Sequence, residues 1–203
     1  MNPTEAPHVV WQPTMLSQTE RSVSLGQMPR CFWFTGLPCA GKTTLAIALE
    51  QRLHRNGRHT CLLDGDNLRH GLTRDLGFTE ADRIENVRRV AEVARLMVDA
   101  GLIVIVALIS PFSAGRQMAR GLFAKGEFIE IYVKTPFEEC ERRDQKGLYA
   151  MARREELSDF TGISSRYESP KQPEVCVDTC VMPVEECVDN VLCCLELPTS
   201  LRY

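Results

Sequence analysis

Short apolar runs alternate with longer amphipathic stretches from residue 31 onward. The apolar runs predict strands at 31–35, 59–63, 102–108, 128–133 and 174–178. Apolar residues at helical spacing predict helices at 42–56, 82–100, 114–124, 136–143 and 184–196. Strands that alternate with helices are typical of a parallel sheet covered on both faces. The pattern therefore predicts an α/β fold with three layers and about five parallel strands.

Two segments fall outside this alternation. Residues 1–30 are rich in Pro, Gln, Ser and Thr and predict an irregular N-terminal arm, in which Val9, Val10 and Trp11 could pack on the domain at 31–203. Residues at about 144–173 have few periodic apolar positions, and a connection of this length is usually functional. We expect it to form a mobile lid. Thr135 and Glu138 have capping-box spacing and predict the start of the helix at 136–143.

The amino-acid composition argues against several classes of partner and site. The chain has 203 residues, 44% hydrophobic and 25% charged, with net charge −3. This balance gives no electrostatic reason to expect nucleic acid or an anionic membrane as a partner. The run at 102–109 is too short to cross a bilayer, and residues 1–30 do not read as a secretory signal. Nine irregularly spaced cysteines favour reduced thiols in a cytoplasmic protein over a zinc site or disulfide framework, with a redox-sensitive pair left open.

A glycine loop follows the first predicted strand. Residues 36–43 read Gly-Leu-Pro-Cys-Ala-Gly-Lys-Thr and fit G-x-x-x-x-G-K-[ST], at the start of a predicted helix. Gly36 and Gly41 let backbone N–H groups turn toward a phosphate. Lys42 would reach the β- and γ-phosphates of ATP, and Thr43 would offer its hydroxyl to Mg²⁺. The loop thus predicts a P-loop NTPase-type sheet and a nucleotide, but not the phosphate acceptor.

Two carboxylates follow the second predicted strand. Asp64 and Asp66 lie at the strand's carboxyl end, where open α/β sheets bind ligands. One could orient metal-bound water and the other could accept a proton from an attacking hydroxyl. An Asp-Gly turn with capping side chains is the alternative. The neighbouring phosphate loop favours the substrate role.

Further along, an aromatic residue and polar groups suggest the acceptor. Arg83 and Asn86 share a helix face, and arginine suits phosphate or sulfate. Phe78 could stack on a base. Ser110 ends a predicted strand, and Pro111 is expected to keep it extended. The alternatives are a solvated helix face and helix-entry chemistry, but the residue types favour an anionic, aromatic second substrate.

Together these motifs resemble the adenylyl-sulfate kinase family, which phosphorylates adenosine 5′-phosphosulfate (APS) on its 3′-hydroxyl. The resemblance spans nearly the whole chain in order. Its matching stretches are 9–11, 32–37, 41–43, 64–72, 76–79, 83–88, 109–111, 146–149, 160–163, 167–168 and 173–175.

The resemblance implies a role for each matching residue. ATP and Mg²⁺ would be held by Gly36, Leu37, Pro38, Cys39, Ala40, Gly41, Lys42, Thr43, Thr44 and Asp64, with Arg142 near the ATP base. The acceptor site would comprise Asp66, Arg69, Phe78, Arg83, Asn86, Ile109, Ser110, Lys146, Gly147, Leu148, Phe160, Thr161 and Gly162. Lys42, Asp66, Ser110 and Lys146 would be catalytic, with Asp66 as base or hydroxyl-orienting group. Phe78 and Phe160 would clamp the APS adenine.

The family carries a phosphorylated serine at the position of Ser110, yet we expect direct in-line transfer because the second substrate already supplies an acceptor. The chain departs from the family at Pro38, which lacks a backbone donor, and at Cys39, which replaces a glycine. The lid departs too, at Gln145 and in the stretch 164–170. These changes bear on affinity and lid behaviour rather than on reaction type.

The resemblance also implies a homodimer and leaves an ATP sulfurylase partner open. Two other functions stay open: a P-loop kinase for another small hydroxyl substrate, and a catalytically weak regulatory nucleotide-binding subunit. The aromatic clamp argues against the first. Retention of Lys42, Thr43, Asp64 and Asp66 argues against the second.

Overall fold

The computed structural model describes residues 10 and 12–193. These residues form five strands: β1 (Arg30–Thr35), β2 (Thr60–Asp64), β3 (Ile103–Ala107), β4 (Phe128–Val133) and β5 (Val175–Val177). The helices are α1 (Gln18–Leu25), α2 (Lys42–Arg55), α3 (Gly65–Leu68), α4 (Glu80–Asp99), α5 (Ser113–Gly121), α6 (Phe137–Arg142), α7 (Leu148–Arg153) and α8 (Val184–Cys193). Every strand and helix that the hydrophobic pattern predicts is present, with shifted ends, and 194–196 of the last helix lie outside the described residues.

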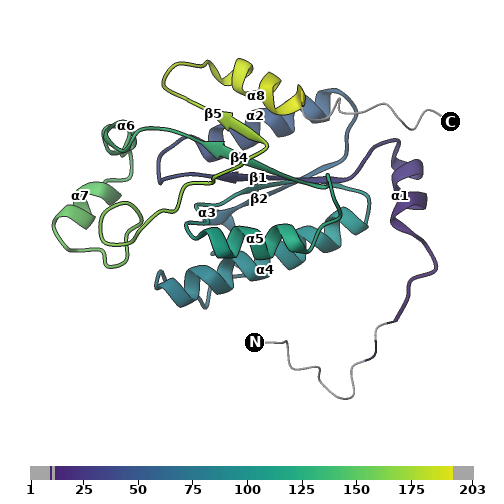
Figure 1. Cartoon of the computed structure of the whole chain (residues 1–203), viewed down its shortest axis with the longest axis horizontal. Coiled ribbons are helices and arrows are strands. Elements are labelled where there is room, and N and C mark those ends of the chain that lie inside the picture. The colour runs from purple at the N-terminus through teal and green to yellow at the C-terminus, as the bar shows by residue number, and fades with distance from the viewer. Residues whose placement is uncertain (1–9, 11, 194–203) are drawn as a thin grey trace.

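The five strands form one parallel sheet in the order β2-β3-β1-β4-β5. Helices α2 and α8 cover one face, and α4 and α5 cover the other (Figure 1). The predicted three-layer α/β fold is therefore confirmed. No helix in the described part of the chain is both long and apolar enough to span a bilayer.

The central strand β1 is buried at all six positions. Because side chains alternate across a strand, Phe32 and Phe34 pack with Leu49 of α2, whereas Trp33 packs with Val90 of α4 on the opposite face. A strand buried on both faces reads as a continuous apolar run, which explains why the sequence pattern located it.

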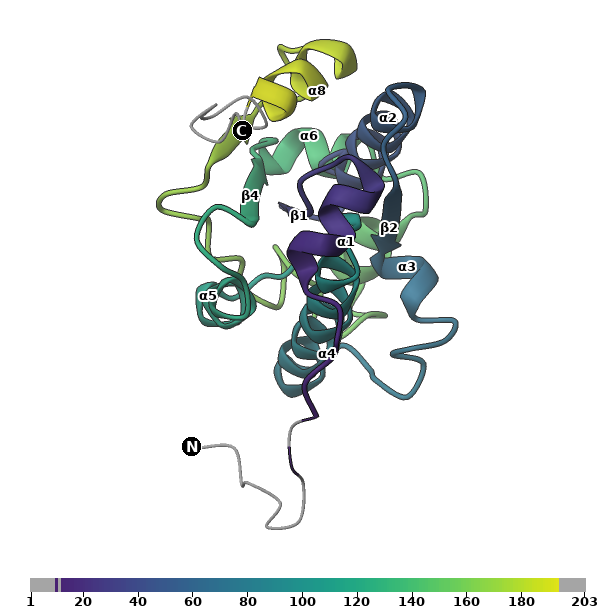
Figure 2. The same cartoon turned by 90° about the vertical axis from the view of Figure 1, so that its right-hand side faces the viewer.

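The expected irregular arm over residues 1–30 is wrong for α1. Ser17 and Glu20 form a reciprocal capping box, and Gly26 ends the helix with a left-handed backbone. Gln18 donates to Glu127 at 2.8 Å, which places α1 near the amino end of β4 (Figure 2). The helix has no buried residue, so it lacks the apolar stripe by which helices are recognised. Val9 and Trp11 lie outside the described residues.

The predicted lid contains a helix that the sequence reading missed. The carboxylate of Asp144 accepts hydrogen bonds from the backbone N–H groups of Leu148, Tyr149 and Ala150, which begin α7. Gly147 precedes the helix with a left-handed φ of +68°. A six-residue helix with one buried aromatic residue is too short to give a periodic pattern.

The predicted capping box at Thr135 is also wrong. Pro136 stands at the cap position of α6, and no side chain caps the helix there. The buried Thr135 hydroxyl instead donates to the carbonyl of Ala40 at 2.9 Å. The Thr135 hydroxyl therefore bonds a carbonyl of another segment instead of a backbone N–H group in the first turn of α6.

Substitution of Gly101 tests whether α1 packs against this residue. An added Cβ there would lie 2.9 Å from Leu25 Cδ1 and 3.3 Å from Arg21 Cβ, whereas a Cβ at Gly57 would meet nothing within 4 Å. Both glycines have positive φ, so both substitutions by alanine carry backbone strain of about 1–2 kcal/mol. We expect Gly101→Ala to lower the free energy of unfolding by roughly 1–3 kcal/mol more than Gly57→Ala, measured by urea denaturation. Equal losses would contradict a docked α1.

Candidate active site

The carboxyl ends of β1, β2, β3 and β4 meet at one edge of the sheet, because all four strands run parallel. This edge carries the loop at 36–41, the carboxylates after β2, the turn after β3 and Thr135 after β4. Parallel α/β sheets bind their ligands at this edge. The segments that the sequence singled out are thus brought together by the strand order.

Two glycines let the loop at 36–41 pass close to the sheet. A Cβ on Gly36 would lie 2.7 Å from the carbonyl oxygen of Val133, closer than non-bonded atoms approach. Gly41 has φ +101° and precedes α2 without any side-chain hydrogen bond to the first helical turn. The free N–H groups of that turn are those that bind a phosphate.

Side chains from distant segments hold the loop's carbonyl groups. The Ala40 carbonyl accepts from the hydroxyls of Thr135 at 2.9 Å and Thr179 at 3.1 Å. The Pro38 carbonyl accepts from the hydroxyl of Tyr149 at 3.0 Å. With these carbonyls held on one side, the loop is fixed for phosphate binding without a proline N–H at position 38.

The sequence reading missed Thr179 and the arginine that positions it. Arg143 donates to the hydroxyl of Thr179 at 2.8 Å and to its carbonyl at 3.0 Å. Arg142, the residue expected near the ATP base, has a side chain 73% exposed and pairs with Glu139 on α6. No local motif marks Arg143, because its partner lies 36 residues away.

Lys42 is buried and points back into the loop. Its ammonium group donates to the carbonyls of Gly36 at 3.0 Å and Leu37 at 2.6 Å. Burial lowers the pKa of Lys42 to about 8. A phosphate at the start of α2 would give this ammonium a charged acceptor in place of two neutral ones.

A hydroxyl and a carboxylate meet beside Lys42. Thr43 donates to Asp64 Oδ2 at 2.7 Å, and Asp64 Oδ1 accepts from the backbone N–H of Asp66 at 3.0 Å, capping α3. The capping alternative for Asp64 is therefore real, and it leaves Oδ2 facing the phosphate loop. One hydroxyl and one carboxylate, completed by phosphates and water, suit Mg²⁺, although the described residues offer no three-residue metal cluster. Thr44 is exposed in the first turn of α2.

Asp66 is paired with the lid. Its Oδ2 accepts a hydrogen bond from the ammonium group of Lys146, and both side chains are largely exposed. This contact raises the pKa of Lys146. Lys146 precedes Gly147 and Leu148, so the start of α7 is brought to the acid residue expected to act on the acceptor.

Two guanidinium groups surround an exposed aromatic ring. Arg69 lies 4.1 Å from the ring centre of Phe78 and donates to the carbonyls of Leu76 and Gly77. Arg83 donates to the carbonyls of Phe78 at 2.9 Å and Asp159 at 2.7 Å. Both arginines donate to neutral carbonyls. The carboxylates of Asp66 and Asp82 act on Arg69, and that of Asp159 acts on Arg83, only through their charge.

Three buried side-chain oxygens lack partners within the described residues: that of Thr73 and two that belong to residues expected at the acceptor site. Asn86 Oδ1 on α4 and Thr161 Oγ1 in the lid segment have no hydrogen-bond partner within the described residues. A buried unsatisfied oxygen destabilises a fold by about 1–3 kcal/mol, so a native example needs a reason. A bound ligand with polar hydrogens would provide one.

Phe160, the second aromatic residue expected to clamp the adenine, is far more buried than Phe78. Phe160 is 8% exposed and packs edge-on against Tyr149 at 4.9 Å, whereas Phe78 is 54% exposed. Gly162 follows at φ +99°, where an added Cβ would lie 3.3 Å from Leu37 and Phe137. The lid segment therefore returns directly over the phosphate loop.

The predicted extended conformation of Ser110 is wrong. Ser110 has φ +40°, 3% exposure, and an Oγ that accepts from Trp33 Nε1 at 3.1 Å. The carbonyl of Ile109 accepts from Thr35 at 2.7 Å, and that of Ser110 accepts from Arg116 at 2.7 Å. These tertiary contacts override the preference that Pro111 imposes on the residue before it.

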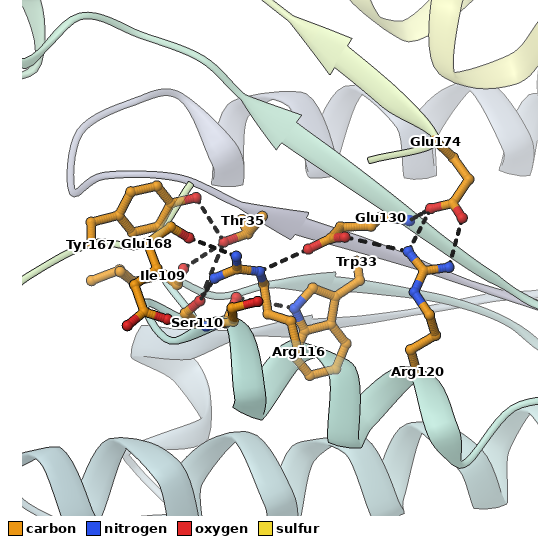
Figure 3. Close-up of polar contacts among 11 residues, drawn as sticks. Trp33, Thr35, Ile109, Ser110, Arg116, Arg120, Glu130, Tyr167, Glu168 and Glu174 are labelled. Carbon is orange, nitrogen blue, oxygen red and sulfur yellow. Dashed lines mark hydrogen bonds and ion pairs between the residues drawn. The ribbon is translucent and has the colours of Figure 1, made fainter. Parts of the chain in front are cut away.

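Arg116 and Glu130 were missed by the sequence reading. Arg116 on α5 donates to Glu130 Oε1 at 2.7 Å, and both residues are buried (Figure 3). A signal was available, since Glu130 interrupts the apolar strand Phe128–Val133. A carboxylate inside a buried strand requires a buried cation as partner.

Comparison with known proteins agrees with this geometry. The chain matches the Adenylylsulphate kinase family over residues 28–178. It is 52% identical over 189 residues to the adenylyl-sulfate kinase of Marinobacter nauticus, covering 93% of this chain and 95% of that protein. It is 59% identical over 184 residues to the bifunctional enzyme NodQ of Rhizobium sp., covering 91% of this chain. The chain spans only 28% of the length of that NodQ.

Solved structures give the same result. The Mycobacterium tuberculosis APS kinase CysC in complex with AMPPNP and APS matches with TM-score 0.80 and 44% identity, over 83% of this chain and 98% of that one. A hexameric APS kinase from Thiobacillus denitrificans matches with TM-score 0.64 and 33% identity, over 88% of this chain and 30% of that one.

Burial of Lys42 makes stability depend on pH. An unfolded lysine keeps its proton to about pH 10.5, whereas folded Lys42 releases it near pH 8. Between these values the unfolded state binds more protons, so raising the pH stabilises the fold. We expect the free energy of unfolding of the ligand-free wild type, relative to Lys42→Met, to rise by roughly 2–3 kcal/mol from pH 7 to pH 10.

Urea denaturation at a series of pH values measures this difference. The matched control is Lys134→Met, which changes an exposed lysine. Its difference from wild type should stay flat over the same range. A flat difference for Lys42→Met as well would show that Lys42 is not held in its buried position.

Proposed function

The chain belongs to the adenylylsulphate kinase family, and we propose that it transfers the γ-phosphate of ATP to the 3′-hydroxyl of APS, forming 3′-phosphoadenylyl sulfate (PAPS). The observation that carries this proposal is the pairing of two sites at one sheet edge. A phosphate loop with free helix N–H groups lies on one side. Two arginines around an exposed phenylalanine lie on the other, and two further residues expected at the acceptor site have unsatisfied buried oxygens.

On the ATP side, the loop at 36–44 and the first turn of α2 would bind the phosphates. Lys42 would leave the carbonyls of Gly36 and Leu37 and follow the transferred charge. Mg²⁺ would be held by Thr43 and Asp64 and would neutralise charge between the β- and γ-phosphates. Arg142 would approach the ATP base after release from Glu139.

On the acceptor side, the anionic end of APS would bind Arg69, Arg83 and Asn86. Arginine binds phosphate and sulfate oxygens with two parallel donors. Phe78 supplies an exposed face for the adenine, and Phe160 would form the opposite wall. Polar hydrogens of the substrate would satisfy Asn86 Oδ1 and Thr161 Oγ1.

Between the two sites, Asp66 would orient the 3′-hydroxyl and accept its proton. Its present partner Lys146 stands at the start of α7, beside Gly147 and Leu148, and would pass to the transferred phosphoryl group. Direct transfer is favoured over a Ser110 phosphate, because the Ser110 hydroxyl is buried and already accepts from Trp33.

The two other functions make different demands. A kinase for a small polyol needs no aromatic ring flanked by two guanidinium groups. A regulatory subunit would not need the arrangement of Lys42, Thr43 and Asp64 that phosphoryl transfer requires. Both observations support the APS kinase proposal.

The cysteines and the relatives bear on the cellular setting and the partners of the enzyme. The eight described cysteines are free thiols, which supports a reduced, cytoplasmic environment. The family resemblance suggests a homodimer. Similarity to a segment of the bifunctional NodQ supports cooperation with a second enzymatic unit, for which ATP sulfurylase is our proposal.

The function can be tested by coupled ADP release. Purified protein with MgATP should release ADP rapidly when micromolar APS is present and slowly when it is absent. Chromatography should identify PAPS in equal amount to the ADP. ADP release that ignores APS, from a folded protein that binds ATP, would favour the other two functions.

Substitution of Asp66 tests its role in transfer. We expect Asp66→Asn to lower kcat by about 10²- to 10⁴-fold, because the amide cannot accept the acceptor's proton. The affinity for ATP, measured by calorimetry, should change by less than about twofold, since the Asp66 carboxylate bonds Lys146 and acts on Lys42 only through its charge. The matched control Asp75→Asn alters an exposed carboxylate paired with Arg89 and should keep wild-type kcat. Equal kcat for both variants would refute the assignment.

A further inference from the structure

Three carbonyl and carboxylate groups from different segments converge on one buried arginine. Arg116 is 3% exposed, and its Nε donates to Glu130 Oε1 at 2.7 Å. Nη1 donates to the carbonyl of Ser110 at 2.7 Å, and Nη2 donates to the carbonyl of Glu168 at 2.6 Å. Figure 3 shows the guanidinium group between these partners. Each of the three guanidinium nitrogens therefore has a hydrogen-bond acceptor.

The first of these segments is a strained turn. Ser110 has φ +40°, a conformation that destabilises a residue other than glycine unless its surroundings impose it. Arg116 holds the Ser110 carbonyl, Trp33 holds the Ser110 hydroxyl, and Thr35 holds the Ile109 carbonyl. Without these hydrogen bonds, the three groups of this dipeptide would be free to move and the turn could relax into an extended form.

The second segment is the end of the lid. The backbone N–H of Glu168 donates to the carbonyl of Pro111 at 2.8 Å, and the Glu168 carboxylate accepts from the N–H of Ser113. The hydroxyl of Tyr167 lies 3.0 Å from that of Thr35, and its ring faces Arg116 at 5.9 Å. The lid thus returns to the domain at the same turn that Arg116 holds.

The ion pair with Glu130 is better explained by geometry than by stability. Replacing a buried ion pair with apolar residues is often neutral or stabilising. What an apolar pair cannot do is direct two donors at two carbonyls while the carboxylate fixes the plane of the guanidinium group. The neighbouring Arg120 shares Glu130 at 3.3 Å but extends to Glu174, away from the turn.

We propose that Arg116 is a positioning residue for the acceptor. It fixes the turn at Ile109 and Ser110, which the family resemblance assigns to the acceptor site, and joins it to the lid's end at Tyr167 and Glu168. This inference rests on the proposed function. Arg116 does not contact the phosphate loop, so acceptor affinity depends on it and ATP affinity does not.

The test compares Arg116→Lys with Arg120→Lys. Lysine keeps the positive charge beside Glu130 but loses the directed donors to the two carbonyls. We expect Arg116→Lys to raise the KM for APS about tenfold or more while the KM for ATP stays within about twofold. Arg120→Lys changes the same helix and shares the same carboxylate, and it should leave both KM values at wild-type levels.

A second readout needs no substrate. The chain has two tryptophans, so in a Trp11→Phe background the emission reports Trp33, whose Nε1 binds Ser110. Arg116→Lys should shift this emission in the ligand-free protein, and Arg120→Lys should not. If Arg116→Lys merely weakened the fold without populating unfolded protein, the Trp33 emission and both KM values would stay at wild-type levels.

The outcomes separate the two hypotheses. If the wild type shows no APS-dependent turnover, the proposed function fails, while the Trp33 emission still decides whether Arg116 holds the turn. If the wild type turns over APS but both arginine variants give the same KM for APS, the positioning role is refuted. Should Arg116→Lys not fold, Glu130→Gln keeps Arg116 but removes the charge that orients it. A rise in the KM for APS alone would then support the role, and unchanged KM values would overturn it.

Discussion

The central strand β1 determines where every other functional element lies. It pairs in parallel with β3 on one side and β4 on the other, and all six of its residues are buried. Because the three strands share a direction, their carboxyl ends deliver the phosphate loop, the Ser110 turn and Thr135 to one edge. Burial on both faces also fixes the register, since a slip by one residue would exchange Trp33 with the phenylalanines beside it. The distances within the site follow from this packing.

At that edge of the sheet, side chains from distant segments donate hydrogen bonds to backbone carbonyl groups. Thr135 and Thr179 hold Ala40, Tyr149 holds Pro38, and Arg116 holds Ser110. A carbonyl that is held on one side of a loop leaves the N–H groups to face the other side, where an anion binds. This arrangement supports the proposed phosphate binding by the loop, although proline and cysteine replace common loop residues. Cys39 takes the left-handed backbone, φ +60°, that a glycine would adopt more easily.

The sequence predicted what is local or periodic, and it missed what depends on tertiary partners. The strands, the amphipathic helices and the P-loop pattern each have a signal within about twenty residues. Thr135 was predicted to cap a helix, but its hydroxyl donates to the Ala40 carbonyl of the phosphate loop. Ser110 was predicted to be extended, but its backbone is left-handed. Neither outcome can be derived from neighbours in the chain, because the deciding contacts with Ala40 and Arg116 come from other elements. Glu130 was missed as well, although a carboxylate in a buried strand indicates that a buried cation lies beside it.

Buried charged residues in this protein are held to their partners, whereas exposed charged residues can exchange theirs. Arg116 and Glu130 are buried and bound on every side, so breaking one contact would leave a charge unsatisfied in a medium of low dielectric constant. Asp66 and Lys146 are largely exposed, and an exposed pair contributes only about 0–1 kcal/mol. The proposed catalytic cycle needs groups of the second kind, because in it the partner of Asp66 changes from a lid lysine to a substrate hydroxyl and back. Under that proposal, the buried pair keeps the Ser110 turn in place while the exposed pair opens at each turnover.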